Sequence, residues 1–305
     1  SGLVVSLGIL IVFKYMDFII KNINYISNSN IKLLRLVLPI GISFYTFQGL
    51  SYIVDVYKKD AKVCRSFVDF ATYVCLFPQL IAGPIVRYTT IEDELKNRTH
   101  SFDKFAYGVN RFVVGLAKKV ILANNLGMLV DIMTKSNEKS VLSYWMVAIF
   151  FSLQIYYDFS GYSDMAIGLG RMFGFDFLEN FNYPFISKSI KEFWRRWHIS
   201  LSSFFRDYVY IPLGGNRVSR GRWIFNLLIV WSLTGLWHGD SWNFILWGLY
   251  FALLLIIENL FLQNILSKLP ALIQHIYAKF FIIISFVIFN NEDRKSVRVG
   301  KECRS

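Results

Sequence analysis

An all-α, multi-pass membrane protein is the fold class that this sequence predicts, and both composition and segment length indicate it. Of the 305 residues, 54% are hydrophobic and only 18% are charged, and the mean hydropathy is +0.41. A soluble domain usually carries about a quarter charged residues. Several apolar runs reach transmembrane length, and they lack the alternating polarity of outer-membrane barrel strands. The sequence therefore predicts a polytopic helical bundle.

Seven apolar segments are candidate membrane spans, and some are shorter than the roughly 20 residues that a helix needs to cross a bilayer. We expect the shorter ones to be tilted or re-entrant. A further segment, Phe105–Met133, carries Arg111, Lys118 and Lys119, which favours a kinked or interfacial helix. The seven candidates are Leu3–Ile20, Leu33–Val54, Phe67–Val86, Val141–Tyr157, Trp223–Trp237, Trp242–Ile257 and Ala271–Phe289.

Proline and glycine interrupt two of these runs, at Pro39-Ile40-Gly41 and at Gly83-Pro84. Inside a membrane, neighbouring helices or polar groups must satisfy the backbone that such breaks release, so both breaks indicate packing within a bundle. Gly170 and Gly174 have the spacing of a small-residue helix contact, although a single instance is weakly specific.

One membrane domain over residues 1–291 is the predicted organisation. The chain has no initiator methionine and opens inside an apolar run, so we expect upstream sequence to be missing. Hydrophobicity stops after Asn291, and we interpret residues 292–305 as a non-native tail that resembles translated sequencing-adapter sequence. A short polar cytoplasmic tail is the alternative.

Basic residues are concentrated in one segment of a chain whose net charge is +12. The positive-inside rule accounts for such a segment as a cytoplasmic loop next to anionic lipid. A compatible interpretation is a site for a phosphate-bearing donor such as coenzyme A or a phosphopantetheine arm. Interleaved tryptophans disfavour nucleic acid as the partner. The basic residues are Lys188, Lys191, Arg195, Arg196, Arg206, Arg217, Arg220 and Arg222, with Glu192 and Asp207 among them.

Two carboxylates, Asp158 and Asp164, lie in a membrane-like segment rich in hydroxyl groups, Tyr156–Asp164. At a separation of six residues they do not share a helical face, so no acid–base dyad is implied. Local hydroxyl groups or a break at Gly161 would satisfy them in one interpretation. In the other they provide a polar lining for a substrate passage.

Two of the four histidines, His198 and His238, lie in aromatic, glycine-marked stretches where an imidazole is costly unless it is used or paired. The Trp, Phe and Arg residues of Glu192–Tyr210 place His198 on an interfacial or re-entrant helix. His238 is expected near the end of the next apolar segment, where Gly239-Asp240 would break the helix and expose the ring. We interpret His100 and His275 as structural.

Acyl transfer is the chemistry that two such histidines favour. A near-neutral imidazole can take the proton of a hydroxyl group as it attacks an acyl carbon, and polar groups can stabilise the oxyanion. Asn243, Ser241 and Thr234 are near His238 in the sequence. Metal-binding His pairs, a Gly-x-Ser-x-Gly nucleophile and a Walker loop are absent from the sequence, and Cys64, Cys75 and Cys303 have no metal-ligand or pairing spacing. Plain helix packing remains an alternative for each histidine.

The longest motifs resemble the membrane-bound O-acyltransferase (MBOAT) superfamily, in its branch of bacterial alginate and peptidoglycan O-acetyltransferase membrane subunits. The resemblance spans roughly Leu33 to Glu258. The stretches that carry it are FWRRWHISLS from Phe193, FRDYVYIPLGG from Phe205, LWHG from Leu236 with Trp242 and LWG from Leu246, PIGISFYTFQ from Pro39 and FPQLIAGPI from Phe77.

This resemblance implies a helical bundle around a central tunnel in the bacterial inner membrane. His238 matches the family's catalytic histidine, which would activate the acceptor, and His198 matches a second histidine that assists or lines the tunnel. Acetyl-CoA is the implied donor, as a substrate and not as a bound cofactor. The acceptor would be a cell-surface polysaccharide, often reached through an extracytoplasmic acetyltransferase partner. Candidate substrate- or tunnel-lining residues are Asp158, Asp164, Arg195, Arg196, Arg206, Asp207 and Asn243.

Two alternatives to this function remain. D-alanyl transfer to teichoic acid from a carrier-protein thioester occurs within the same superfamily. A transporter or channel would move a donor or glycan without making bonds. The acceptor, whether alginate, peptidoglycan, another exopolysaccharide or a secondary metabolite, is not fixed by these motifs.

Overall fold

The computed structural model describes residues 2–80, 83–137 and 140–290, and in these ranges it contains helices and loops but no β-strand. The predicted all-α class is confirmed. The predicted tail, residues 292–305, and Ile81-Ala82 of one motif lie outside the described residues.

Four continuous helical stretches are long and apolar enough to cross a membrane, as judged by length and composition: Gly2–Ser27, Phe102–Lys135, Trp242–Leu266 and Ala271–Asn290. The second of them contains the segment that we predicted to be a kinked or interfacial helix. It is one helix whose irregularity is a π-helical stretch, and its length suffices for a span. The chain is therefore a membrane protein built of helices.

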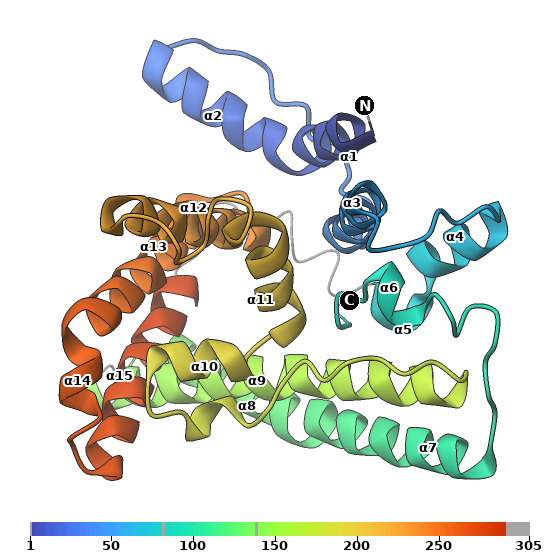
Figure 1. Ribbon diagram of the computed structural model, residues 1–305. Helices are drawn as coiled ribbons and strands as arrows, with labels where there is room; N and C mark the ends of the chain where they lie inside the picture. Colours follow the sequence, from blue (N-terminus) through green and yellow to red (C-terminus); the bar gives the residue numbers. More distant parts are fainter. Residues whose placement is uncertain (1, 81–82, 138–139, 291–305) are drawn as a thin grey trace.

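Figure 1 shows the arrangement of the helices along the chain. The α-helices are α1 (Gly2–Leu10), α2 (Met16–Ser27), α3 (Ile42–Lys58), α4 (Phe67–Cys75), α5 (Phe77–Leu80), α6 (Tyr88–Ile91), α7 (Phe102–Ala117), α8 (Asn124–Lys135), α9 (Val141–Met172), α10 (Ile190–Arg196), α11 (Ile199–Phe205), α12 (Arg220–His238), α13 (Trp242–Ile257), α14 (Gln263–Leu266) and α15 (Ala271–Asn290). The π-helical stretches are η1 (Ile11–Tyr15), η2 (Lys118–Ala123), η4 (Arg206–Tyr210) and η5 (Glu258–Leu262), and η3 (Pro184–Ile186) is a 3₁₀ turn.

Two of the predicted spans are not single helices. In Leu33–Val54 the helix starts only at Ile42, because Gly41 adopts a left-handed backbone (φ +75°) directly after Pro39-Ile40. Phe67–Val86 is divided into α4 and α5 by extended backbone at Leu76. Pro78 lies in the first turn of α5, where its missing N–H costs no helical hydrogen bond. These spans were wrong because hydropathy alone does not distinguish a helix from an apolar loop.

α9 is longer than predicted and runs without a break through Gly161 to Met172, over 32 residues. Its length is about 48 Å at 1.5 Å per residue. A capping box begins it, in which Ser140 Oγ accepts from the Ser143 amide at 3.1 Å and Ser143 Oγ accepts from the Ser140 amide at 2.9 Å.

Glycines bring α7 and α9 into backbone contact, and the two helices lie side by side along their length (Figure 1). Gly108 faces Gly168, and Gly115 faces Gly161. A Cβ on Gly115 would come within 2.5 Å of the Gly161 carbonyl oxygen, and one on Gly168 within 2.6 Å of the Gly108 oxygen. Small residues permit such close approach in membrane helices.

The predicted contact at Gly170 and Gly174 is wrong. Gly170 makes room for the ring of Phe177, which follows in the next loop, and Gly174 turns the chain with φ +82° just after α9 ends. Both glycines serve the turn and not a helix–helix interface.

α12, α13 and α15 form the second part of the bundle, and α15 also lies against α9. Gly248 of α13 fits against the backbone of Trp231 and Gly235 in α12. An aromatic core joins these helices to α10; its large buried members are Phe193, Trp194, Trp197, Trp231, Trp247, Phe251 and Phe286. α10 is therefore anchored to the helices that surround it.

Candidate active site

His238 is the last residue of α12, and the helix break predicted after it is confirmed. Gly239 is extended, and α13 begins at Trp242. His238 is a half-buried residue. Its imidazole lies among aromatic rings, with centroid distances of 4.9 Å to Trp237, 4.8 Å to Trp247 and 5.4 Å to Phe289. The helix end and these rings together fix its position.

Two side chains from the N-terminal helix cap the end of α12. Lys14 Nζ donates to the carbonyl oxygen of Trp237 and, at 2.9 Å, to Ser43 Oγ. Tyr15 Oη donates to the carbonyl oxygen of Leu236 at 2.7 Å. The last carbonyls of a helix lack internal partners and carry partial negative charge, so an ammonium group stabilises them. Sequence reasoning missed Lys14; its only signal is a lone lysine in an apolar run.

Lys14→Met is expected to lower the free energy of unfolding by about 1.5–3 kcal/mol, the range for hydrogen bonds that involve a charged group. The cause is that the carbonyl of Trp237 loses its donor beside His238. The measurement is denaturant unfolding of the purified protein in detergent. Lys21→Met is the matched control, because Lys21 is exposed on α2; equal loss in both variants would contradict the capping role.

We predicted that His198 lies on a helix, and this is wrong. It lies between α10 and α11, in a left-handed backbone conformation (φ +45°). This conformation is uncommon outside glycine. The side chain is 1% exposed, and Nδ1 lies 3.1 Å from Asn180 Oδ1. Glu258, the first residue of η5, holds α10 in place by accepting from the amides of Ile190 and Lys191 at 2.8 and 3.1 Å. Phe193 and Trp194 of α10 also belong to the aromatic core.

Asn180 is the residue at this site that sequence reasoning missed entirely. Its Oδ1 also accepts from the Ser200 amide (3.2 Å) and hydroxyl (2.9 Å), and its Nδ2 donates to Ser163 Oγ on α9 at 3.1 Å. It lies in the loop after α9, where no periodicity or motif marks it.

Trp237 brings the two histidines into one site. Its ring centroid lies 5.6 Å from that of His198 and 4.9 Å from that of His238. Phe159 of α9 packs edge-on against His198 at 4.6 Å. The residues at 198 and 238 thus face a common aromatic ring although 40 positions separate them in the chain.

The three polar residues proposed for the oxyanion differ in their placement. Asn243 accepts from Ser241 Oγ and donates to the carbonyl of Phe289 at 3.4 Å, and the Phe289 ring contacts His238. Asn243 therefore lies beside the site. Thr234 donates to Val230 O in its own helix at 2.8 Å, so its hydroxyl hydrogen is already used.

Asp158 and Asp164 are satisfied neither by local hydroxyls nor by a helix break, but by basic residues of the neighbouring helix. Asp158 pairs with Lys119. Asp164, whose side chain is 8% exposed, lies 2.7 Å from Arg111 and 2.5 Å from Lys118. Sequence reasoning did not foresee this pairing.

The two carboxylates differ in their relation to the histidines. Asp164 directly follows Ser163, which binds Asn180, so it is close to the His198 network. The Asp158 side chain is 48% exposed, and its ion pair is separate from that network. A role for either in lining a tunnel stays a prediction.

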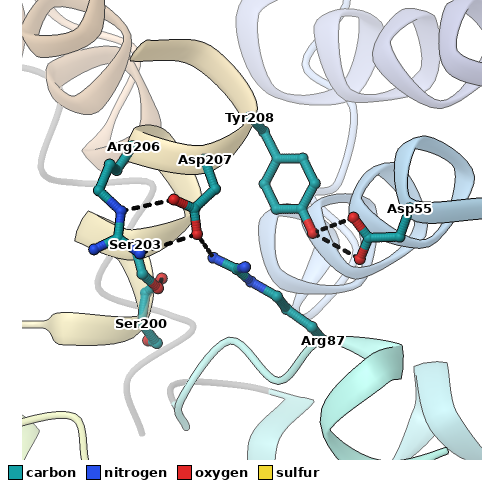
Figure 2. A network of polar contacts seen from close by, with 7 residues as sticks. All are labelled: Asp55, Arg87, Ser200, Ser203, Arg206, Asp207 and Tyr208. Atoms are coloured by element: carbon teal, nitrogen blue, oxygen red, sulfur yellow. Dashed lines mark hydrogen bonds and ion pairs between the residues drawn. The ribbon is translucent and has the colours of Figure 1, made fainter. Parts of the chain in front are cut away.

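The basic candidates near His198 are largely engaged with acidic partners. Arg196 donates to Glu192 at 3.0 Å and to the carbonyl of Asn182 at 3.2 Å, whereas Arg195 is exposed. Figure 2 shows Arg206 and Arg87 both binding Asp207. Their donor-binding role stays a prediction.

The Asp207 network ties η4 to other parts of the chain. Arg87 reaches Asp207 from the loop before α6 at 2.7 Å, and Tyr208 Oη donates to both oxygens of Asp55 on α3 at 2.7 and 2.8 Å (Figure 2). Partial burial alone would raise the pKa of Asp207, but the hydrogen bonds from Arg206 and Arg87 outweigh it and hold that pKa below its usual value. Asp207 is thus an ionised structural link.

Metal ligands do not gather at this site. Among the residues at 2–80, 83–137 and 140–290, no three His, Cys, Asp or Glu side chains are placed to hold a metal ion.

Comparison with known proteins places this geometry in a family. The profile of the MBOAT, membrane-bound O-acyltransferase family matches residues 62–292, a range that contains both histidines, Asn180 and Trp237. The chain belongs to the membrane-bound O-acyltransferase family. In this chain His238 ends α12, and His198 lies at the break between α10 and α11.

Similar proteins are named as enzymes that acylate alginate, peptidoglycan or teichoic acid. The probable alginate O-acetylase AlgI of Azotobacter vinelandii is 45% identical over 96% of this chain and 59% of the relative. The peptidoglycan O-acetyltransferase of Helicobacter pylori is 36% identical over 97% of the chain and 62% of the relative. The teichoic acid D-alanyltransferase of Bacillus subtilis is 33% identical over 74% of the chain and 60% of the relative. The chain thus spans about three fifths of the length of these relatives.

Proposed function

We propose that this protein is a membrane O-acetyltransferase that moves an acetyl group from acetyl-CoA towards hydroxyl groups of a cell-surface polysaccharide. His238 acts as the base that activates the acceptor, and His198, whose ring packs against the same Trp237, assists it. The protein works in the bacterial inner membrane as a multi-pass subunit, with an extracytoplasmic acetyltransferase as its partner.

The observation that carries this proposal is the pair of imidazoles packed on Trp237 in a chain 45% identical to an alginate O-acetylase. An imidazole that is partly exposed at a helix end can accept a proton from a bound hydroxyl group. His238 fits this role because it is a half-buried residue at the break after α12. His198 is buried and lies beside it.

The donor side of the proposal rests on charge. Arg195 and Arg206 are exposed basic groups on the segment around His198, and guanidinium groups suit the phosphates of coenzyme A. Asn243, beside His238, is the candidate for stabilising the oxyanion that forms at the acetyl carbonyl.

D-alanyl transfer to teichoic acid is the second candidate, because a D-alanyltransferase is also similar to the chain, at 33% identity. The higher identity and wider coverage of the O-acetylases favour acetyl over D-alanyl.

The test compares wild type and His238→Ala in a strain that lacks the gene, and measures base-labile acetate and D-alanine released from purified envelope polysaccharides. We expect acetate to disappear in His238→Ala while the protein still inserts in the membrane. His100→Ala, at an exposed histidine in the loop before α7, is the matched control and should retain acetate. Loss of D-alanine in place of acetate would support the second candidate. Unchanged esters in both variants would refute acyl transfer through His238 and favour a transporter.

A further inference from the structure

Asn180 makes contacts with three successive residues around the buried histidine. Beyond the side-chain contact to His198, its backbone carbonyl accepts from the Ile199 amide at 2.9 Å, and its Oδ1 accepts from the Ser200 amide at 3.2 Å. Asn180 is itself fully buried, with 0% exposure. One residue of the loop after α9 therefore holds the chain from 198 to 200, including the left-handed turn at His198.

The orientation of the Asn180 amide follows from its fixed partners. A backbone N–H can only donate, so the atom that faces the Ser200 amide must be the oxygen. With the amide turned this way, Nδ2 donates to Ser163 Oγ at 3.1 Å. A flipped amide would set two N–H groups against each other at Ser200.

The proton of the His198 ring is placed by the same logic. Because Asn180 Oδ1 only accepts, the Nδ1 atom at 3.1 Å must carry a hydrogen to make this bond. Ser200 Oγ cannot replace that partner: it lies 3.5 Å from Nδ1, and its hydrogen is directed to Asn180 at 2.9 Å. In the neutral ring, Nε2 is then the unprotonated nitrogen.

This Nε2 atom is otherwise unused. It is buried and has no hydrogen-bond partner among the residues that the structure describes. Buried polar atoms are nearly always paired with protein, water or ligand. The lone pair of this ring, which packs against Trp237, is therefore free to accept from a substrate group or a bound water.

We infer that Asn180 is a positioning residue that fixes His198 as the Nδ1–H tautomer and so keeps Nε2 as a proton acceptor facing substrate chemistry; this inference rests on the proposed function. An ion-pair clamp keeps the residue in place. Arg111 on α7 binds both Asp164 at 2.7 Å and Glu179 at 2.6 Å, and these are the direct neighbours of Ser163 and Asn180. The loop and α9 are thus tied together on both sides of the Asn180–Ser163 hydrogen bond.

The test uses the protein in lipid bilayers with ¹⁵N-labelled histidine rings, and reads the protonation of each ring nitrogen by solid-state NMR above neutral pH. The His198 signals are identified by their loss in His198→Asn. We expect wild type to show a protonated Nδ1 and an unprotonated Nε2. Asn180→Leu, which keeps the branched shape but not the acceptor, should give a mixture of tautomers. Transfer should be about 10–100-fold slower, the range found when a metal-bound histidine loses its orienting hydrogen-bond partner. Asn182→Leu is the matched control, at an exposed position two residues away, and should change neither.

Asn180→Asp separates positioning from folding. Its carboxylate still accepts from Nδ1–H, so the tautomer and part of the rate should return relative to Asn180→Leu. The added negative charge favours the imidazolium and raises the pKa of His198. As the pH is lowered, activity that needs the neutral ring should therefore be lost at a higher pH in Asn180→Asp than in wild type. A purely structural role of Asn180 would not cause this shift.

Several outcomes would overturn the inference. One is a proton on Nε2 of His198 in wild type, a result that does not depend on whether Asn180→Leu folds. The others are an unchanged tautomer in Asn180→Leu and an unshifted pH profile in Asn180→Asp. The proposed function fails separately. If wild type transfers no acyl group but the tautomer depends on Asn180 as described, the positioning role stands and the activity is different. If transfer needs His238 but does not depend on the Asn180 acceptor, the proposed function stands and the positioning role of Asn180 fails.

Discussion

Acetyl transfer is expected to fall on the order of 1,000-fold in His238→Gln and in His198→Gln, and the double variant should be no slower than the slower single variant. A general base contributes about 10²–10⁴-fold to a rate. Groups that act in one step lose their effect together, so their losses do not multiply. The measurement is the initial rate of labelled acetate incorporation from acetyl-CoA in membranes, normalised to the amount of inserted protein.

The non-additivity follows from the geometry around Trp237. Both imidazoles contact this ring, at 5.6 and 4.9 Å between centroids, so a change at one position alters the packing that orients the other. Independent histidines would instead give a double variant whose loss is the product of the two single losses.

His275→Gln is the control for replacing a partly buried histidine. Its Nδ1 lies 3.1 Å from the carbonyl oxygen of Ser187, and it belongs to α15, away from the Trp237 contacts. The variant should keep the rate within about twofold. If it lost as much activity as His198→Gln, the effect at 198 would reflect folding. If both His198→Gln and His238→Gln kept the wild-type rate, neither ring would take part in the reaction.

Helices with an uninterrupted apolar run were predictable almost to the residue. The span predicted at Trp242–Ile257 coincides with α13, and that at Ala271–Phe289 differs from α15 by one residue. In both, the helix begins after a residue that stops helices or caps them, Ser241 in one case and Pro270 in the other. Local sequence determines these bounds because no distant partner is needed to satisfy the segment.

Where a segment depends on distant partners, its structure was not predictable. Asp158 and Asp164 suggested a break in the helix, yet α9 continues because Lys119, Lys118 and Arg111 neutralise the carboxylates from 39 to 53 residues away. A single sequence contains no signal for such a pairing. The same holds at Leu33–Val54, where hydropathy does not distinguish the apolar loop before α3 from a helix.

The site was predictable in its chemistry but not in its support. His198 and His238 stood out because imidazoles are rare in apolar, aromatic stretches. Asn180 had no such mark, since an asparagine in a loop is ordinary. Its role exists only because the fold brings the loop after α9 against the turn between α10 and α11. Lys14 is a similar case, since its partner carbonyl lies 223 residues further along the chain.

Gly161→Ala is expected to destabilise the protein by about 1–3 kcal/mol, the usual cost of overpacking. The new Cβ would lie 2.7 Å from the carbonyl oxygen of Gly115 and 3.2 Å from Cβ of Lys118. Backbone atoms cannot rotate away, so α7 and α9 must separate. Because Ser163 and Asp164 follow on α9, this separation would also loosen the attachment of Asn180. Thermal and denaturant unfolding in detergent measure the effect.

Gly49→Ala is the matched control, because Gly49 also lies inside a helix but a Cβ there would have no atom within 4 Å. Alanine costs less chain entropy than glycine, so this variant should be more stable by about 0.5–1 kcal/mol. The two substitutions are chemically identical, but they should change the free energy of unfolding in opposite directions. Equal effects would mean that the glycine contact does not limit the approach of the helices.

The double variant Gly115→Ala/Gly161→Ala gives the sharper test of this contact. At each glycine the added Cβ would meet the carbonyl oxygen of the other, at 2.5 and 2.7 Å. One separation of α7 from α9 relieves both clashes, so the loss of stability should be smaller than the sum of the two single losses. Strictly additive losses would show that each helix adjusts alone. A combined loss below the sum would instead identify the α7–α9 distance as the variable that sets the cost of both substitutions.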